Sequence, residues 1–300
     1  MPRREFEERG FVVVRDALPP SLLACLVRAH DNIYCSERVA GRLADDGSLH
    51  LLGFLTLDDT FLELLDLPAV FPLVCDALGW NIYAYHSHLD THPQETRDAP
   101  RRWRWHQDGG RQNVELETRP TRPRLSVKVG YFLTDVLTAE SGAMLVIPGS
   151  HVRNTLPRPA AGDESFAEPD GAEAVLAPAG SAIVFDCRLW HARGANRSDI
   201  ARKALFVAYT FRWIRPREDL WSPEYARLSP LKRQLLGAAT DQLGYWLPGD
   251  GDVPLRAIRE APMMNIPRAR CRRRSRHRGH ELSHPEGLMG RGLYLATRRS

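Results

Sequence analysis

The stretch Arg102-Trp103-Arg104-Trp105-His106-Gln107-Asp108-Gly109-Gly110 contains the pattern around which the rest of the chain is organised. His106 and Asp108 stand two residues apart, and in a β-strand this spacing points both side chains to one face of the sheet. An imidazole and a carboxylate on one face can share a divalent metal ion. A histidine from elsewhere in the chain would complete the 2-His-1-carboxylate set, which binds Fe(II) and leaves coordination positions open. The tripeptide alone is a weak signal, because H-x-D occurs more often in solvated loops.

A third ligand is available at His191, in the segment Leu189-Trp190-His191-Ala192-Arg193-Gly194, which follows a predicted strand and runs into a turn. Arg202 stands eleven residues further on, where the last strong strand begins. A buried arginine at this point can hold a dicarboxylate through a bidentate, charge-assisted pair. An isolated arginine would more often form a surface ion pair. Because Arg202 follows His191 at this spacing, the pattern predicts an anion site close to the metal.

Strand patterns dominate the middle of the chain. Runs rich in β-branched or alternating apolar residues occupy residues 10–15, 81–89, 124–133, 141–151, 180–185 and 203–213. Helical spacing of apolar residues comes mostly before them, at residues 21–34, 57–65 and 69–78, and a loop is expected over 36–50. Many antiparallel-type strands after a group of helices predict an α+β chain, mostly β in its core, built on a β-sandwich or jelly roll. Residues 155–173 are expected to form a loop at the site mouth.

The sequence predicts one domain over residues 1–267. Its parts are N-terminal helices (1–80), a jelly-roll core (81–215) and a C-terminal segment (216–267). From Arg268 the composition changes, because residues 268–300 hold ten Arg and two Glu, a net charge of +8. The whole chain carries +4, so the first 267 residues carry 4 − 8 = −4. A run of like charge repels itself and usually stays disordered, which is what we expect of this tail.

The composition places the chain among ordinary globular proteins, at 43% hydrophobic and 26% charged residues. No apolar run has the length of a membrane span, and the N-terminus has no apolar stretch typical of a secretory signal. The five scattered cysteines, without C-x-x-C, disfavour a disulfide framework and suit a reducing cytoplasm. We therefore expect a cytoplasmic protein with neither nucleic acid nor membrane as partner. The oligomeric state stays open.

Four motifs in order resemble the phytanoyl-CoA dioxygenase family, whose members are Fe(II)- and 2-oxoglutarate-dependent oxygenases. They are W-H-Q-D, V-x-Y-F-L-T-D, G-A-M-L-V-I-P-G-S-H and W-H-x-x-x-x-N-x-S-x-x-x-R, and the resemblance covers about residues 10 to 215. It implies a double-stranded β-helix, also called a jelly roll, with Fe(II) as the metal and 2-oxoglutarate and O2 as cosubstrates. The Arg-rich tail matches nothing in the family.

The same resemblance implies roles for individual residues. It assigns His106, Asp108 and His191 to the iron, and Arg202 to the C5 carboxylate of 2-oxoglutarate. It also implies that the strand before H-x-D and the strand before the G-A-M-L-V-I-P-G-S-H turn line the cosubstrate pocket, which adds these residues: His86 and His88, and Lys128 or Tyr131. His88 and Lys128 have an alternative interpretation as structural residues with satisfied hydrogen bonds.

The implied reaction is hydroxylation of an unactivated C–H of a small molecule, with release of succinate and CO2. Asp108 favours hydroxylation, because related iron halogenases have a small residue in place of the carboxylate to make room for halide. One alternative is a metal-binding, cupin-like jelly roll without oxygenase activity, which would share the three ligands but not need Arg202. A nucleic-acid-binding function depends on the tail alone, because the body lacks aromatic–basic interleaving and any zinc motif.

Overall fold

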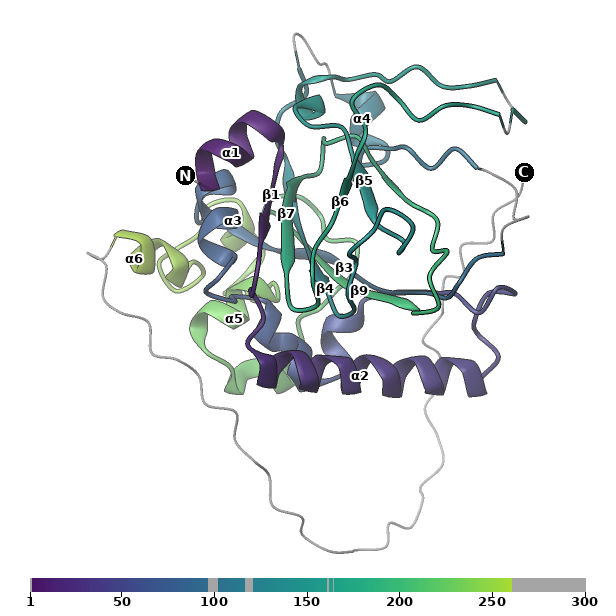
Figure 1. Cartoon of the computed structure of the whole chain (residues 1–300). Helices are drawn as coiled ribbons and strands as arrows, with labels where there is room; N and C mark the ends of the chain where they lie inside the picture. The colour runs from purple at the N-terminus through teal and green to yellow at the C-terminus, as the bar shows by residue number, and fades with distance from the viewer. Residues whose placement is uncertain (1, 97–101, 117–120, 161, 164, 261–300) are drawn as a thin grey trace, which may run out of the picture. The chain divides into compact units, whose positions relative to one another are not determined.

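The computed structural model describes the chain over residues 2–96, 102–116, 121–160, 162–163 and 165–260 (Figure 1). By its internal contacts the chain divides after Ile266. The Arg-rich tail predicted from Arg268 onward lies outside the described residues. No helix in the described ranges is long and apolar enough to cross a membrane.

Two antiparallel sheets form the core of the protein. The larger has the strand order β1-β7-β4-β9-β3-β2, with the bounds Phe11–Val14, Ala182–Asp186, Ser126–Phe132, Arg202–Phe211, Ile82–His92 and Leu49–Leu52. The smaller has the order β6-β5-β8, with the bounds Glu173–Val175, Met144–Val146 and His191–Arg193. Neighbouring strands are mostly distant in sequence, as expected when a jelly roll brings successive strands to different sheets. The predicted α+β class with a β core is confirmed.

Two of the helices cover one side of the larger sheet, and a third runs along one end of its strands. Figure 1 shows α3 and α5 on the side of this sheet away from β5 and β6, and α2 running along one end of the strands. The α-helices are α1 (Pro2–Arg9), α2 (Pro20–Val39), α3 (Phe71–Leu78), α4 (Gln112–Glu115), α5 (Pro230–Leu235) and α6 (Pro254–Glu260). Short 3-10 helices occupy Phe54–Thr56, Asp59–Leu64, Ser150–Val152, Pro223–Arg227 and Gln242–Tyr245.

The two faces of the larger sheet have different neighbours because side chains alternate along each strand. In β4, Val127, Val129 and Tyr131 pack into the core shared with the helices. Lys128 and Phe132 point the other way, into the space between the sheets, where Phe132 joins a second apolar cluster. Polar residues on this inner face therefore line the interior of the jelly roll.

Two elements differ from the sequence-based expectation. Helix α2 continues to Val39, five residues past the predicted end. The prediction stopped early because the last turn is mostly exposed and lacks the apolar spacing of a buried helix face. Strand β2 lies inside the predicted loop over 36–50 and just beyond it, as a four-residue edge strand paired with β3. Strand β1 falls within the strand predicted over residues 10–15, and both β1 and β2 join the larger sheet.

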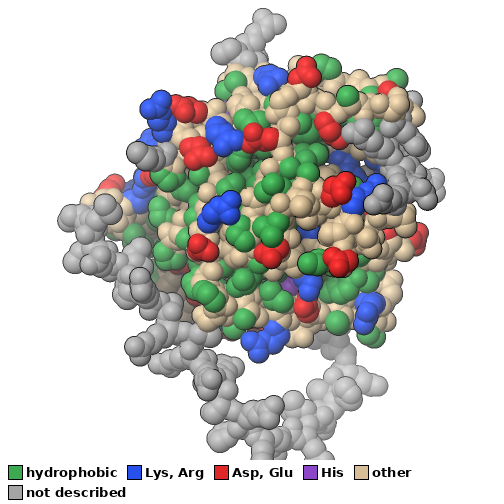
Figure 2. Space-filling model, in the orientation of Figure 1, with side chains coloured by type: hydrophobic (Ala, Val, Ile, Leu, Met, Phe, Trp, Pro, Cys, Tyr) green, Lys and Arg blue, Asp and Glu red, His purple; other side chains and the backbone are tan. Residues whose placement is uncertain are grey.

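Charged side chains of both signs are interspersed over the face seen in Figure 2, with hydrophobic side chains between them. This face has no continuous basic surface of the kind that nucleic-acid binding requires.

Candidate metal centre and cosubstrate site

The two predicted ligand histidines lie directly opposite each other. The His106 N–H donates to the carbonyl oxygen of His191 at 2.9 Å, and the His191 N–H donates to that of His106 at 3.0 Å. Their rings are 4.2 Å apart between centroids. The predicted strand around His106 is reduced to this single bridge. The chain turns immediately afterwards, where Gly109 and Gly110 have φ of +119° and +55°, values that favour glycine.

Asp108 lies in that turn and still faces both imidazoles. Its N–H donates to the Cys187 carbonyl oxygen at 2.8 Å, which ties the turn to the end of β7. Its Oδ1 is 3.9 Å from His106 Nε2, and its Oδ2 is 3.9 Å from His191 Nε2. One ion held at about 2.0–2.2 Å by each ligand sets its ligands about 3–4 Å apart. The three side chains therefore leave room for one ion between them.

Backbone carbonyls hold both imidazoles in the tautomer that a metal needs. His106 Nδ1 donates to the Arg104 carbonyl oxygen and His191 Nδ1 to that of Leu189, each at 2.8 Å. Each ring therefore turns an unprotonated Nε2 toward Asp108. Burial and the neighbouring His106 lower the pKa of His191 to about 3, so it stays neutral near pH 7. Two neutral imidazoles and a carboxylate fit Fe(II).

Lys128 holds the carboxylate. Its buried ammonium lies 2.7 Å from Asp108 Oδ2. Burial by itself would raise the pKa of Asp108, but Lys128 and the two imidazoles lower that pKa below its usual value, so the carboxylate stays ionised. The structure thus places Lys128 at the metal end of the site.

Tyr131 does not share that position. Its side chain is fully buried on the opposite face of β4, where its hydroxyl donates to the Leu64 carbonyl oxygen at 3.2 Å. The prediction that Tyr131 lines the cosubstrate pocket is corrected, because residues 128 and 131 differ by an odd number and point to opposite faces of a strand.

Arg202 begins β9 and is 4% exposed. No ion pair joins its guanidinium to a described carboxylate, and its buried Nε has no hydrogen-bond partner. Burial lowers its pKa, and the charge of Asp90 offsets this only in part. A Cβ on Gly142 would come within 3.3 Å of Arg202 Cδ, so glycine leaves the side chain its space. A buried guanidinium with a hydrogen-bond donor that lacks a partner is expected at an anion-binding site.

His92 is a residue that the sequence reasoning missed at this end of the site. It pairs in register with Arg202 across β3 and β9, and its buried Nδ1 also has no hydrogen-bond partner. Two unpartnered nitrogens therefore lie on neighbouring strands at one place. The signal was present in the sequence, because β3 has polar residues at every second position: His86, His88, Asp90 and His92.

His88 lies on the same inner face but already has a partner. Its Nδ1 is 3.2 Å from Asp90 Oδ1, and its ring stacks on Phe206 at 4.5 Å between centroids. His50, from β2, donates to the same Asp90 oxygen at 2.7 Å. Burial lowers the pKa of His88 to about 4, so it is neutral near pH 7. This placement favours the structural interpretation of His88.

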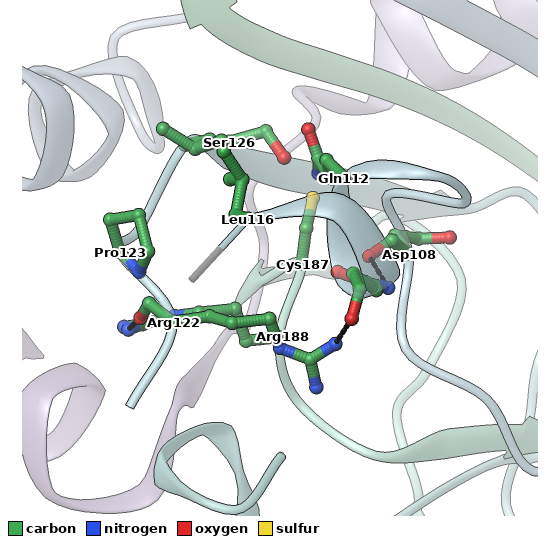
Figure 3. Close-up of a pocket in the computed structure, with 10 residues that line it drawn as sticks. Asp108, Gln112, Leu116, Arg122, Pro123, Ser126, Cys187 and Arg188 are labelled. Atoms are coloured by element: carbon green, nitrogen blue, oxygen red, sulfur yellow. Dashed lines mark hydrogen bonds between the residues drawn. The ribbon is translucent and has the colours of Figure 1, made fainter. Parts of the chain in front are cut away.

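Two cavities adjoin Asp108. The smaller, of about 10 Å³, lies between the turn after Asp108 and the end of β7, and Figure 3 shows Gln112, Ser126 and Cys187 around it. The larger, of about 290 Å³, lies beside Asp108 and Lys128 and reaches the chain that follows β9.

Comparison with known proteins identifies relatives of the same kind. The family model for phytanoyl-CoA dioxygenase matches residues 6–204. The dioxygenase andF of Emericella variicolor is 30% identical over 155 residues, which are 49% of this chain and 52% of that protein, so the chain spans about half the length of this relative. The ectoine dioxygenase of Sphingopyxis alaskensis is 26% identical over 239 residues, which are 68% of this chain and 73% of that protein.

Solved structures share the fold. EctD from S. alaskensis in its apo form has a TM-score of 0.57 at 23% identity, over 72% of this chain and 78% of that one. The epimerase SnoN, solved with Fe3+, alpha-ketoglutarate and nogalamycin RO, has a TM-score of 0.52 at 19% identity, over 72% and 85%. The double-stranded β-helix is thereby confirmed. Because the family model spans about two thirds of the chain and includes both H-x-D and the distal histidine, the chain belongs to the phytanoyl-CoA dioxygenase family of the Fe/2-oxoglutarate-dependent dioxygenases.

Proposed function

We propose that the protein hydroxylates an unactivated C–H of a small-molecule substrate in an Fe(II)- and 2-oxoglutarate-dependent reaction that releases succinate and CO2. The observation that carries this proposal is that two candidate sites lie in the interior of the jelly roll, one on each sheet. One is the three-residue cluster that can hold a metal, and the other is the buried Arg202, which lacks an ion pair among the described residues.

In this proposal His106 and His191 bind the metal through Nε2, and Asp108 binds it through its carboxylate. Fe(II) bound in this way supplies the oxidative chemistry with O2 and leaves positions for the 2-oxo acid. The carbonyl oxygens of Arg104 and Leu189 keep the imidazoles oriented. Lys128 keeps Asp108 ionised and limits its rotation.

Arg202 binds the far carboxylate of 2-oxoglutarate in this proposal, and His92 donates from the opposite strand. A guanidinium fork matches a carboxylate bidentately, which fixes the direction of the cosubstrate as well as its affinity. Between the anchor and the metal, the inner face of β9 carries Ala204, Phe206 and Ala208, of which the two alanines leave space.

A metal-binding jelly roll without oxygenase activity is the alternative. Such a module needs the three ligands but has no use for a buried cation that lacks an ion pair, and burying one is costly. Arg202 therefore favours the oxygenase.

The test separates the two sites. Purified protein is loaded anaerobically with Fe(II), and binding of 2-oxoglutarate is followed by the visible charge-transfer band that forms when a 2-oxo acid chelates iron. Succinate release is then measured in air with a panel of small molecules. We expect one iron per chain, the absorption band, and succinate release that specific compounds accelerate. Iron binding without any 2-oxoglutarate binding would instead support the cupin-like module.

A further inference from the structure

The cavity of about 290 Å³ beside Asp108 is lined by an excess of cationic side chains. Lys128 lies at its inner end, and Arg215 and Arg217, from the chain after β9, lie at its mouth, where both are exposed. Asp108 is the one carboxylate among the residues that line it. This carboxylate is paired with Lys128 and assigned to the metal, so the positive charge of the two arginines is left over.

The chain around Arg217 is fixed against β3. The Arg217 N–H donates to the Tyr85 carbonyl oxygen at 2.8 Å. The adjacent carboxylate of Glu218 accepts from the Ser87 N–H at 2.7 Å and from His86 Nδ1 at 2.5 Å. The Glu218 carboxylate therefore binds to residues of β3 and does not neutralise Arg217. No described carboxylate forms an ion pair with Arg215 or Arg217, although ion pairs are common among the other arginines of this chain.

Arg202 does not line the cavity that these two arginines share with Lys128. Lys128 is opposite Ala208 of β9, and Ala208 is opposite His86 of β3, so the cavity lies at that row. Arg202 stands six residues away along β9, at the start of the strand. One end of the interior thus provides a cation for the cosubstrate, and the other end provides separate cations of its own.

We propose that this cavity binds the substrate and that the substrate is a small anion, with a carboxylate or phosphate held by Arg215 and Arg217 and its carbon skeleton directed toward Asp108. This inference rests on the proposed oxygenase function. The volume is at the lower end of the range of about 300–1,000 Å³ for ligand pockets, which fits a small molecule and not a polymer. His86 lines the cavity but adds no charge near pH 7, because burial lowers its pKa. A bound divalent ion would add further attraction for an anion.

The test measures binding without turnover. The Fe(II)–2-oxoglutarate protein is kept anaerobic, and dissociation constants are measured by calorimetry for a panel of acids with matched neutral amides: butanoate, hexanoate, octanoate and 4-phenylbutanoate, with butyl phosphate as the phosphate probe. We expect at least one acid to bind about tenfold more tightly than its amide. Arg217→Gln should weaken that acid about fivefold and leave the amide unchanged, and Arg215→Gln/Arg217→Gln should weaken it further. Arg38→Gln removes the same charge from an exposed position on α2 and should have no effect.

Three results would overturn the inference: no acid or phosphate binds, acids and amides bind equally, or the double variant binds the acid as the wild type does. A rise in the dissociation constant of 2-oxoglutarate in Arg217→Gln would also overturn it, because the arginines would then serve the cosubstrate. The iron content and the 2-oxoglutarate band of the same samples report separately on the proposed function. Acid binding that persists without that band would refute the oxygenase and keep the anion site.

Discussion

The chain contains two H-x-D sequences, and each meets a further histidine from another strand. His106 and Asp108 meet His191 of β8, while His88 and Asp90 meet His50 of β2. Both groups contain two imidazoles and one carboxylate, and both lie on the inner side of the jelly roll. By residue type alone they are equivalent candidates for a metal.

Their hydrogen bonds separate them. In the His106 group the Nδ1 atoms donate outward to backbone carbonyls, and the Nε2 atoms stop 3.9 Å from the carboxylate oxygens, which leaves room for an ion. In the His88 group, two Nδ1 atoms lie 2.7 and 3.2 Å from the same oxygen of Asp90, which are hydrogen-bond distances. The second group is a closed polar network beside Arg202. Whether such a group can bind a metal thus depends on the hydrogen-bond partner of Nδ1, which decides which ring nitrogen faces the carboxylate.

The largest expected effect comes from removing the distal ligand. His191→Ala should reduce iron-dependent succinate formation by more than about 100-fold, beyond what loss of an outer hydrogen-bond partner costs a metal site. Bound iron is measured by mass spectrometry after anaerobic loading. His50→Ala is the matched control and should retain one iron per chain. If the two variants bound iron alike, the comparison between the two groups would fail.

Replacing the metal-binding carboxylate provides a second strong test. Asp108→Gly should abolish hydroxylation, because it opens a coordination position and removes the ligand charge. The measurement is product formation by mass spectrometry once an accelerating substrate is known. The parallel change Asp90→Asn should leave iron content unaltered. Hydroxylation that persisted in Asp108→Gly would contradict the ligand assignment.

The next effect concerns the cosubstrate anchor. Truncating one partner of a buried charge pair costs about 2–5 kcal/mol, and at about 1.4 kcal/mol per decade the lower value predicts a KM for 2-oxoglutarate about 30-fold higher in Arg202→Ala. Arg202→Lys should be partly tolerated, because it keeps the charge and loses the fork. Iron content should stay at the wild-type level in both. A kinetic titration of 2-oxoglutarate decides the point, and an unchanged KM would remove Arg202 from its assigned role.

The closed network should contribute to stability instead of to iron binding. In His88→Ala the buried Asp90 loses a hydrogen-bond donor, which costs about 1–3 kcal/mol of unfolding free energy. Urea denaturation of the metal-free protein measures this difference. Loss of iron without loss of stability would show that the second group, too, binds metal.

A gradual effect on stability is expected with pH. Burial lowers the pKa of His88 to about 4, while the same side chain has a pKa near 6.5 in the unfolded chain. The unfolded state therefore binds more protons below pH 6.5, and stability falls as the pH is lowered from 6.5 to about 4, by up to about 1.4 kcal/mol per pH unit for this histidine. Unfolding of the metal-free protein across this range should follow the predicted slope, and His88→Phe should reduce it. A slope identical in both proteins would exclude His88 as its source.

The smallest effect is predicted for the tail. We propose that residues 1–267 suffice for folding and iron binding, so deletion after Pro267 should leave the melting temperature and iron content nearly unchanged. A large fall in the melting temperature of the truncated protein would disprove this.

The sequence by itself determined the family and the chemistry of the metal. The spacing of His106 and Asp108, the turn after His191 and the position of Arg202 all belong to local motifs. The structure brings the side chains of His106, Asp108 and His191 together. Strand parity would also have excluded Tyr131, because it points away from Lys128. These features depend on residue type and on short-range periodicity, which a sequence displays directly.

Only the tertiary structure decided which of the two H-x-D sequences leaves room for an ion. It also placed His92 opposite Arg202 on the neighbouring strand, and it placed Arg215, Arg217 and Lys128 around one cavity. Tertiary contacts also place β1 and β2 in the larger sheet, although each is only four residues long. The physical reason is that these relations join residues that are distant in the chain. These relations depend on strand register and on the direction in which each ring nitrogen points, so a shift by the length of a single hydrogen bond changes them. No local sequence pattern specifies positions to that length.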